Sequence, residues 1–168
     1  CQKCPATKLS IFPMKEYCAS NKSFYQSAEE KIFIITTSRG CINRCNFCYR
    51  LEKGIRLRSI GNIIKEMKIL LVRYGINCYA FEDELFVYSK KRLLEFKQAL
   101  DQSGLRIKFD CNARADIIDE EIAEILKNCG CQFINIGFES SSDQVLKLMH
   151  KNTTVEQNIG ALEIVKKC

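Results

Sequence analysis

The chain has 168 residues, 11 of them cysteine, and carries 26 Lys and Arg against 20 Asp and Glu, a net charge of +6. This length suffices for a buried core without a disulfide framework. The sequence shows no secretory leader and no apolar run of roughly 18 residues, which argues against a membrane span and predicts a reducing cytoplasmic location. Its basic residues are spread along helical stretches without a recognition motif, so nucleic-acid binding is not indicated.

The first 31 residues differ in character from the remainder. Both prolines, Pro5 and Pro13, lie in this stretch, which shows no sustained helical or strand periodicity. Such a composition predicts a linker or N-terminal extension over 1–31. We therefore expect the organised domain to occupy 32–168.

Strand and helix patterns alternate in this domain. Short apolar or β-branched runs predict four strands, over 32–37, 78–81, 106–110 and 133–138. Amphipathic stretches predict helices after Ser59, Ser89 and Asp119, then over 142–149 and 154–166, the last with a capping box of Thr153 and Glu156. This alternation is the repeat of a parallel sheet, so the fold class is α/β: a partial (β/α) TIM-type barrel of about four βα units, or an open arc.

Polar segments follow each predicted strand. The cysteine loop follows the first, "EDE" (82–84) the second, "CNAR" (111–114) the third and "ES" (139–140) the fourth. In an α/β sheet or barrel the ligand lies over the carboxyl ends of the strands. We expect these four loops to meet on one face.

The loop "CINRCNFCY" (41–49) contains three closely spaced thiols, Cys41, Cys45 and Cys48. Structural zinc requires four ligands, and the single histidine, His150, is far along the chain. A [4Fe–4S] cluster takes one thiolate per iron, so three cysteines would leave one iron open. Spacing alone leaves an iron–sulfur site, a zinc site and chance clustering as alternatives.

Five segments carry a resemblance to a known family. They are, in order, "TTSRGCINRCNFCYR", "IRLRS", "FEDELF", "CNARAD" and "IGFESSSDQVLKLMHKNTT". Their order and spacing resemble the radical S-adenosylmethionine (SAM) superfamily, and within it the cobalamin-dependent and anaerobic magnesium-protoporphyrin monomethyl ester cyclase-like group. The resemblance covers the chain from about residue 31 to its end.

The resemblance implies an oxygen-sensitive enzyme that holds a [4Fe–4S] cluster and SAM at the strand ends. In that family the amino and carboxylate groups of SAM occupy the open iron, and one electron cleaves SAM to a 5′-deoxyadenosyl radical that takes hydrogen from a substrate. The electron donor would be a flavodoxin or ferredoxin, and the substrate is not identified by the sequence. No catalytic residue is assigned.

The resemblance also implies metal ligands and cofactor contacts. The metal ligands are Cys41, Cys45 and Cys48; the cofactor contacts are Phe47, Asp83, Glu84, Arg114, Gly137, Glu139 and Ser140. Asp83 and Glu84 resemble an acidic pair that holds the SAM amino group, and Glu139 resembles a carboxylate that hydrogen-bonds SAM. Arg114 resembles a residue near the SAM carboxylate or ribose, with an ion pair to Asp116 or Glu120 as the alternative.

Several features depart from the family pattern. The superfamily core usually has six βα units, so this chain resembles a fragment whose independent activity is in doubt. No Asp-x-His-x-x-Gly loop surrounds His150, so cobalamin is expected only through an upstream domain of the full-length protein. Cys78 and Cys111 are expected to pack as small apolar residues. A non-catalytic iron–sulfur or zinc-binding module is the alternative function.

Overall fold

A computed structural model describes residues 13–20, 30–49 and 54–168. In chain order its elements are α1 (Met14–Ser20), β1 (Ile32–Ile35), β2 (Ser38–Cys41), β3 (Gly54–Leu57), α2 (Ile60–Tyr74), β4 (Cys78–Phe81), α3 (Lys90–Ser103), β5 (Lys108–Ala113), η2 (Ala115–Ile117), α4 (Glu120–Cys129), β6 (Cys131–Ile136), α5 (Asp143–Leu148) and α6 (Val155–Lys167). None of the helices in these ranges is long and apolar enough to cross a bilayer.

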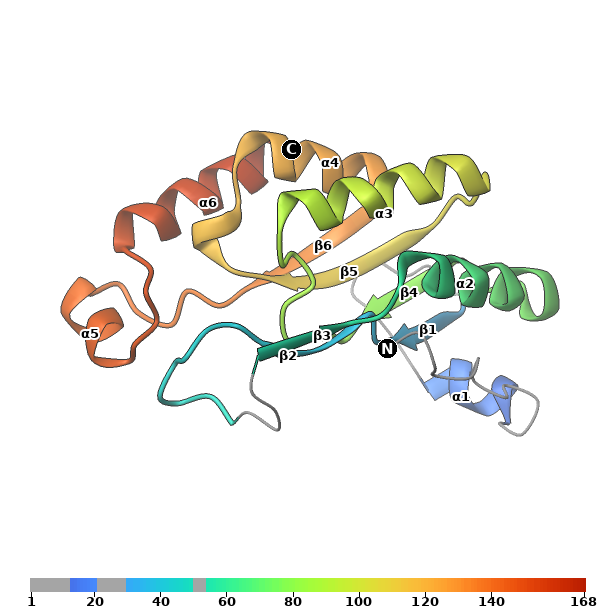
Figure 1. Cartoon of the computed structure of the whole chain (residues 1–168), viewed down its shortest axis with the longest axis horizontal. Helices are drawn as coiled ribbons and strands as arrows, with labels where there is room; N and C mark the ends of the chain where they lie inside the picture. The colour runs from blue at the N-terminus through green and yellow to red at the C-terminus, as the bar shows by residue number, and fades with distance from the viewer. Residues whose placement is uncertain (1–12, 21–29, 50–53) are drawn as a thin grey trace.

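Four strands form one parallel sheet in the order β1-β4-β5-β6, and β2 and β3 form a separate antiparallel hairpin. Helices α3, α4 and α6 lie above the sheet in Figure 1, and α1 lies at the lower right, beside the edge strand β1. Because each strand pairs with the preceding strand of the parallel sheet, all four carboxyl ends share one edge. The predicted α/β class and partial barrel are confirmed.

The helix ends follow local sequence signals. Ser59, Ser89 and Asp119 each accept a hydrogen bond from the backbone N–H three residues ahead, and they start α2, α3 and α4. Gly104 and Gly130 end α3 and α4 in left-handed conformations that glycine adopts without strain. The three helix starts agree with those predicted from the sequence.

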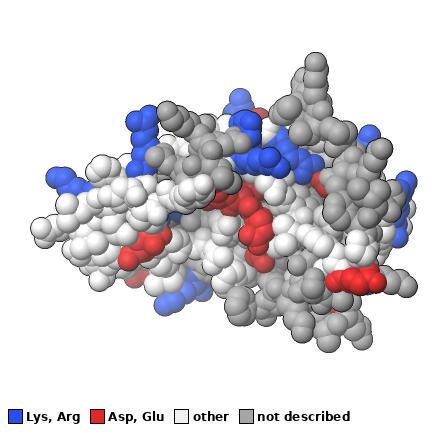
Figure 2. All heavy atoms as spheres, turned by 90° about the horizontal axis from the view of Figure 1, so that it is seen from below, with Lys and Arg blue, Asp and Glu red and all other residues white. Residues whose placement is uncertain are grey.

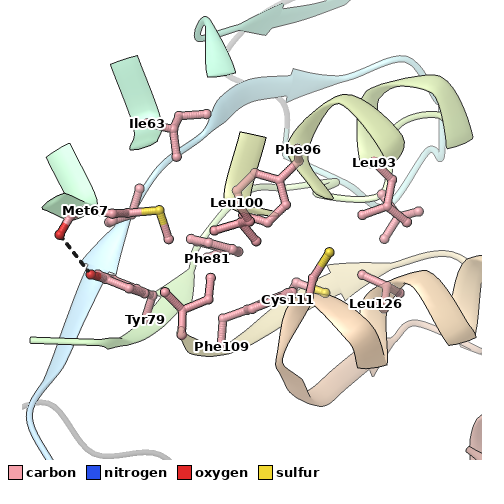
Figure 3. Packing of buried hydrophobic residues seen from close by; sticks show 14 of the residues in the cluster. Ile63, Met67, Tyr79, Phe81, Leu93, Phe96, Leu100, Phe109, Cys111 and Leu126 are labelled. Carbon is pink, nitrogen blue, oxygen red and sulfur yellow. Dashed lines mark hydrogen bonds between the residues drawn. The ribbon is translucent and has the colours of Figure 1, made fainter. Parts of the chain in front are cut away.

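The main core lies between the sheet and the helices. Tyr79 and Phe81 of β4 and Phe109 of β5 point toward the helices in Figure 3. The ring centroids of Phe81 and Phe109 are 4.8 Å apart, and Phe96 of α3 meets Phe109 edge-on at 6.2 Å. The buried hydroxyl of Tyr79 donates to the carbonyls of Met67 and Ile76, so this aromatic layer contains a satisfied polar group.

The opposite face of the sheet changes character from β1 to β6. Ile32 of β1 packs there against the small side chains of Cys78 and Ala80 of β4. Side chains alternate along a strand, and Phe109, Cys111 and Ala113 face the helical core, so Asn112 of β5 faces the other way. Asn135 of β6, which pairs with Asn112, shares that face and is exposed. Asn112 donates from its side chain to the Asp83 carbonyl at 2.8 Å, so this end of the face is polar.

Three features differ from the sequence-based expectations. β5 begins at Lys108 and β6 at Cys131, so both strands are displaced by two residues from their predicted starts. The β2–β3 hairpin was not predicted. The capping box of α6 consists of Thr154 and Gln157, so the predicted pair Thr153 and Glu156 was wrong.

The N-terminal stretch 1–31 contains one described helix. Met14 and Cys18 of α1 are buried in the main core, and the ring of Tyr17 lies 5.2 Å from that of Phe33 in β1. This part of the expected linker or extension therefore packs on the sheet. The boundary at residue 31 stays a prediction.

Candidate functional site

The cysteine loop begins at the end of β2, between the two strands of the β2–β3 hairpin. Cys41 is the last residue of β2 and pairs with Gly54. Gly40 has a φ of +84°, and a Cβ there would lie 2.3 Å from the carbonyl oxygen of Gly54. Only glycine fits this close approach, so the hairpin fixes the position at which the loop starts.

The loop is held from the other side by the segment that joins α5 to α6. Asn46 donates from its backbone N to the Met149 carbonyl (3.0 Å) and from its side chain to the Leu148 carbonyl (2.8 Å). The ammonium of Lys151 lies 5.9 Å from the ring centroid of Phe47. The shape of this loop therefore depends on a contact between Asn46 and Leu148, which are 102 positions apart in the chain.

The thiols of Cys41 and Cys45 receive N–H donors. Asn43 donates to Cys41 Sγ from its backbone N and its side chain, both at 3.5 Å. Arg114 donates from Nη1 to Cys45 Sγ at 3.8 Å, and Cys45 is buried. These contacts place N–H groups beside two sulfurs of the loop. Cys48 is exposed.

No three His, Cys, Asp or Glu side chains among the described residues are placed to hold a single metal ion. A [4Fe–4S] cluster makes a different demand, because each thiolate binds its own iron and the ligands surround the cube. Three cysteine sulfurs in one short loop, with N–H donors to Cys41 and Cys45, fit that group.

The two acidic residues after β4, Asp83 and Glu84, lie in different environments. Asp83 is 1% exposed and accepts from the backbone N of Thr37 (2.6 Å), the hydroxyl of Thr37 and the hydroxyl of Ser38 (2.8 Å). Glu84 is exposed. Asp83 therefore links the end of β4 to the start of the hairpin, and Glu84 is the member of the pair that is open to a ligand.

Glu139 lies just beyond β6 with its backbone in the left-handed region, at a φ of 62°. Its carboxylate pairs with the Lys151 ammonium at 3.1 Å, and its side chain is 31% exposed against 7% for Lys151. A Cβ on Gly137 would lie 2.5 Å from this carboxylate, so glycine makes room for the pair. Ser140 accepts through its hydroxyl from the backbone N of Ser142, which orders the turn.

Arg114 follows β5 and is buried. Its guanidinium donates to Asp116 from Nε (2.9 Å) and Nη2 (3.1 Å), and Nη2 also donates to the Lys151 carbonyl (2.5 Å). The ion pair with Asp116, one of the two sequence-based alternatives, is present. The contact with Cys45 adds a link to the cysteine loop that the sequence did not reveal.

The structure thus joins four predicted site residues into one network: Cys45, Phe47, Arg114 and Glu139. Lys151 connects this network, because its ammonium meets Phe47 and Glu139 and its carbonyl accepts from Arg114. The sequence analysis missed Lys151, since a lysine beside a polar loop usually indicates a solvated surface. His150 and Asn152, on either side of it, have positive φ values of 52° and 56°.

The cysteines of the sheet and helices have a different environment. Burial raises the pKa of Cys78 to about 11 and that of Cys129 to about 12. A hydrogen bond with Cys131, together with burial, raises the pKa of Cys111 well above its usual range. These residues are thiols at neutral pH and pack as small apolar side chains, as expected for Cys78 and Cys111.

The molecule carries charges of both signs on its lower side. Figure 2 shows that face, with Lys and Arg side chains gathered above an acidic group near the middle of the view. Arg39 and Arg44, which border the cysteine loop in the sequence, are exposed.

Comparison with known proteins gives the context for this network. Residues 35–168 match the Radical SAM superfamily. The chain belongs to this superfamily. The predicted membership is confirmed, and the family operates with a [4Fe–4S] cluster and SAM.

The chain is 32% identical over 166 residues to an uncharacterized methyltransferase of Pyrococcus horikoshii, covering 97% of this chain and 34% of the relative. It is 26% identical over 149 residues to the anaerobic magnesium-protoporphyrin IX monomethyl ester cyclase of Rubrivivax gelatinosus, covering 86% and 27%. The structure of the cobalamin-dependent SAM radical enzyme OxsB matches with a TM-score of 0.69 and 31% identity, covering 81% and 22%. These relatives are enzymes, and this radical SAM chain spans about a third of their length or less.

Proposed function

We propose that this radical SAM domain binds a [4Fe–4S] cluster through Cys41, Cys45 and Cys48 and uses it to cleave SAM reductively. The observation that supports this most is the loop itself. The loop with the three thiols starts at the end of β2, where only glycine fits at position 40. Hydrogen bonds from Asn46 attach the loop to the segment after α5. When bound, the cluster and SAM would supply a 5′-deoxyadenosyl radical for modification of a substrate.

In this proposal the residues of the chain bind and orient the cofactor. The half-exposed carboxylate of Glu139 would accept from the SAM amino group, while Lys151 keeps it in place. Glu84, Gly137 and Ser140 would border SAM at the strand ends. Phe47, which is 48% exposed, would cover one side of the cluster. Asp83 would act indirectly, by joining β4 to the hairpin.

The proposal places the domain in a longer cytoplasmic enzyme with an unidentified substrate and a low-potential one-electron donor, such as a flavodoxin or ferredoxin. Cobalamin would enter only through another domain. The relatives support the greater length alone, because each is much longer than this chain.

The first test concerns the metal. After anaerobic reconstitution, the chain is expected to hold about four iron atoms and to lose them when Cys41, Cys45 or Cys48 is replaced by Ala. Cys168→Ala, at an exposed cysteine outside the loop, is the matched control and should keep its iron. Stoichiometric zinc with no iron uptake would contradict the assignment.

The second test separates SAM binding from cluster binding. Glu139→Ala should keep full iron content and weaken the SAM-induced change in the spectrum of the reduced cluster. A charged hydrogen bond is worth about 1.5–3 kcal/mol, or roughly ten- to a hundredfold in affinity. An unaltered SAM titration would remove Glu139 from the site.

That variant needs a structural control, because removal of Glu139 leaves the buried ammonium of Lys151 without its carboxylate. The double variant Glu139→Ala/Lys151→Met removes both charges. If SAM affinity falls in both variants while the double variant melts like the wild type, the loss belongs to Glu139 and not to a damaged fold.

A further inference from the structure

The guanidinium of Arg114 has a fixed orientation. Arg114 is 7% exposed, and Nε and Nη2 both bind the Asp116 carboxylate, while Nη2 also binds the Lys151 carbonyl. A planar guanidinium held by a carboxylate and a carbonyl cannot rotate away from its plane. Its remaining terminal nitrogen, Nη1, therefore points steadily at Cys45 Sγ, 3.8 Å away.

The sulfur that receives this donor is also buried. Cys45 is 8% exposed, so its contact with Arg114 lies out of bulk water, where charge-assisted hydrogen bonds are stronger than at the surface. The backbone on both sides is held in place as well: Cys48 N donates to the Cys45 carbonyl at 3.4 Å, and the next residue, Asn46, is bound to Met149. Donor and acceptor are thus both positioned before any cofactor binds.

We propose that Arg114 is a positioning residue for the cluster that tunes its reduction potential through an N–H···S hydrogen bond to the Cys45 thiolate. This inference rests on the proposed function and gives Arg114 a role other than contact with SAM. Hydrogen bonds to ligand sulfurs are among the features that set iron–sulfur potentials. Lys151, whose carbonyl anchors Arg114, places a second buried cation in the same network.

The electron balance is simple. The oxidised cluster gains one electron from a low-potential reductant, dithionite in the test below, and no bond is made or broken. The added electron increases the negative charge on the ligand sulfurs. A fixed cationic donor therefore stabilises the reduced form more than the oxidised form and raises the potential.

The experiment is a potentiometric titration of the reconstituted chain, followed by electron paramagnetic resonance in the absence of SAM. Arg114→Gln should be reduced about tenfold less readily, a fall of about 59 mV for a one-electron couple. Arg114→Lys should recover part of that shift, because it keeps the charge but not the three-way bonding. Arg92→Gln is the matched control, since Arg92 is partly buried and donates to the Arg58 carbonyl; its potential should equal that of the wild type.

A gentler variant covers the case in which Arg114→Gln fails to fold. Asp116→Glu keeps both charges but displaces the carboxylate that holds the guanidinium, so the potential should fall by less than in Arg114→Gln. A potential equal to that of the wild type in every folded variant with full iron content would overturn this inference alone. A wild-type chain that takes up no iron would overturn the proposed function, and this inference with it.

Discussion

At the scale of single residues, environment divides the described cysteines into two groups. Cys78, Cys111 and Cys129 are buried by apolar side chains and have raised pKa values. In the loop, Cys41 and Cys45 have N–H donors, and Cys48 is exposed. The same residue type therefore fills space in the core and, in the proposed function, offers a metal ligand in the loop.

This division predicts a pattern of alkylation in the metal-free chain. A pKa of about 11 leaves roughly one Cys78 thiol in ten thousand ionised at pH 7, and only the thiolate reacts. Cys48 and Cys168, which are exposed, should be modified by iodoacetamide first. Peptide mass mapping should find Cys78 and Cys129 unmodified until denaturant is added. Early labelling of Cys78 in the folded chain would contradict the described packing.

At the scale of elements, the β2–β3 hairpin is the support from which the cysteine loop extends. Its four residue pairs join Ser38–Cys41 to Gly54–Leu57, and Asp83 anchors its start through Ser38. The hairpin is separate from the parallel sheet, so it can weaken without disruption of the main core.

Gly40→Ala should damage this hairpin selectively. The left-handed φ and the contact with the Gly54 carbonyl make alanine unfavourable by roughly 1–3 kcal/mol. We expect lower iron content after reconstitution, with the far-ultraviolet circular dichroism of the helices retained. Gly61→Ala in α2 is the control: nothing lies within 4 Å of its Cβ, and alanine should stabilise the helix by up to about 1 kcal/mol. Full iron content in Gly40→Ala would show that the hairpin does not determine the position of the cysteine loop.

Much of the fold could be predicted because the local signals agree with the tertiary structure. Apolar runs marked the parallel strands, and capping side chains marked the helix starts. The hairpin could not be predicted, since "SRGC" lacks an apolar alternation and the alternation in "GIRL" spans only four residues. The capping box was misplaced because Thr153 and Thr154 each have Glu or Gln three residues ahead, and only burial of Thr153 decides between them.

The candidate site was predictable in part for a similar reason. The cysteine motif and the strand-end carboxylate stand out in the sequence, and the structure links them through Lys151. The role of Lys151 depends on contacts between segments far apart in the chain. The position of Asn112 and Asn135 on the polar face of the sheet could have been predicted. Alternation along β5 and β6 places both residues on the face opposite the apolar side chains.

At the scale of the whole molecule, the sheet is an open arc. Among the described strands, β6 has a partner on one side only, and Phe133 on it is 40% exposed. We expect further βα units of the parent protein to extend the sheet along this edge, with 1–31 as the connection to whatever precedes the domain. The polar face over β5 and β6 would then become the interior of a fuller barrel.

This organisation predicts that the chain alone does not bind cobalamin. His150 is exposed and adjoins Met149 and Lys151, without the Asp-x-His-x-x-Gly loop that holds cobalt in cobalamin domains. A titration with hydroxocobalamin should leave its visible absorbance unchanged in the presence of the chain. Tight binding, detected as a shift of the absorbance bands and retention after gel filtration, would contradict the domain assignment.

The cysteine loop is synthesised well before Arg114 and Leu148, the residues that hold it in place. Asn46 binds Leu148, made 102 residues later, and Cys45 binds Arg114, made 69 residues later. At about 5–20 residues per second of synthesis, the three thiols emerge roughly 5–20 s before the last of these anchors. During that interval they are exposed to oxidants without the contacts that shape the loop. If the loop binds the proposed cluster, insertion would follow synthesis of the α5–α6 connection and would be a late event in the life of the nascent chain.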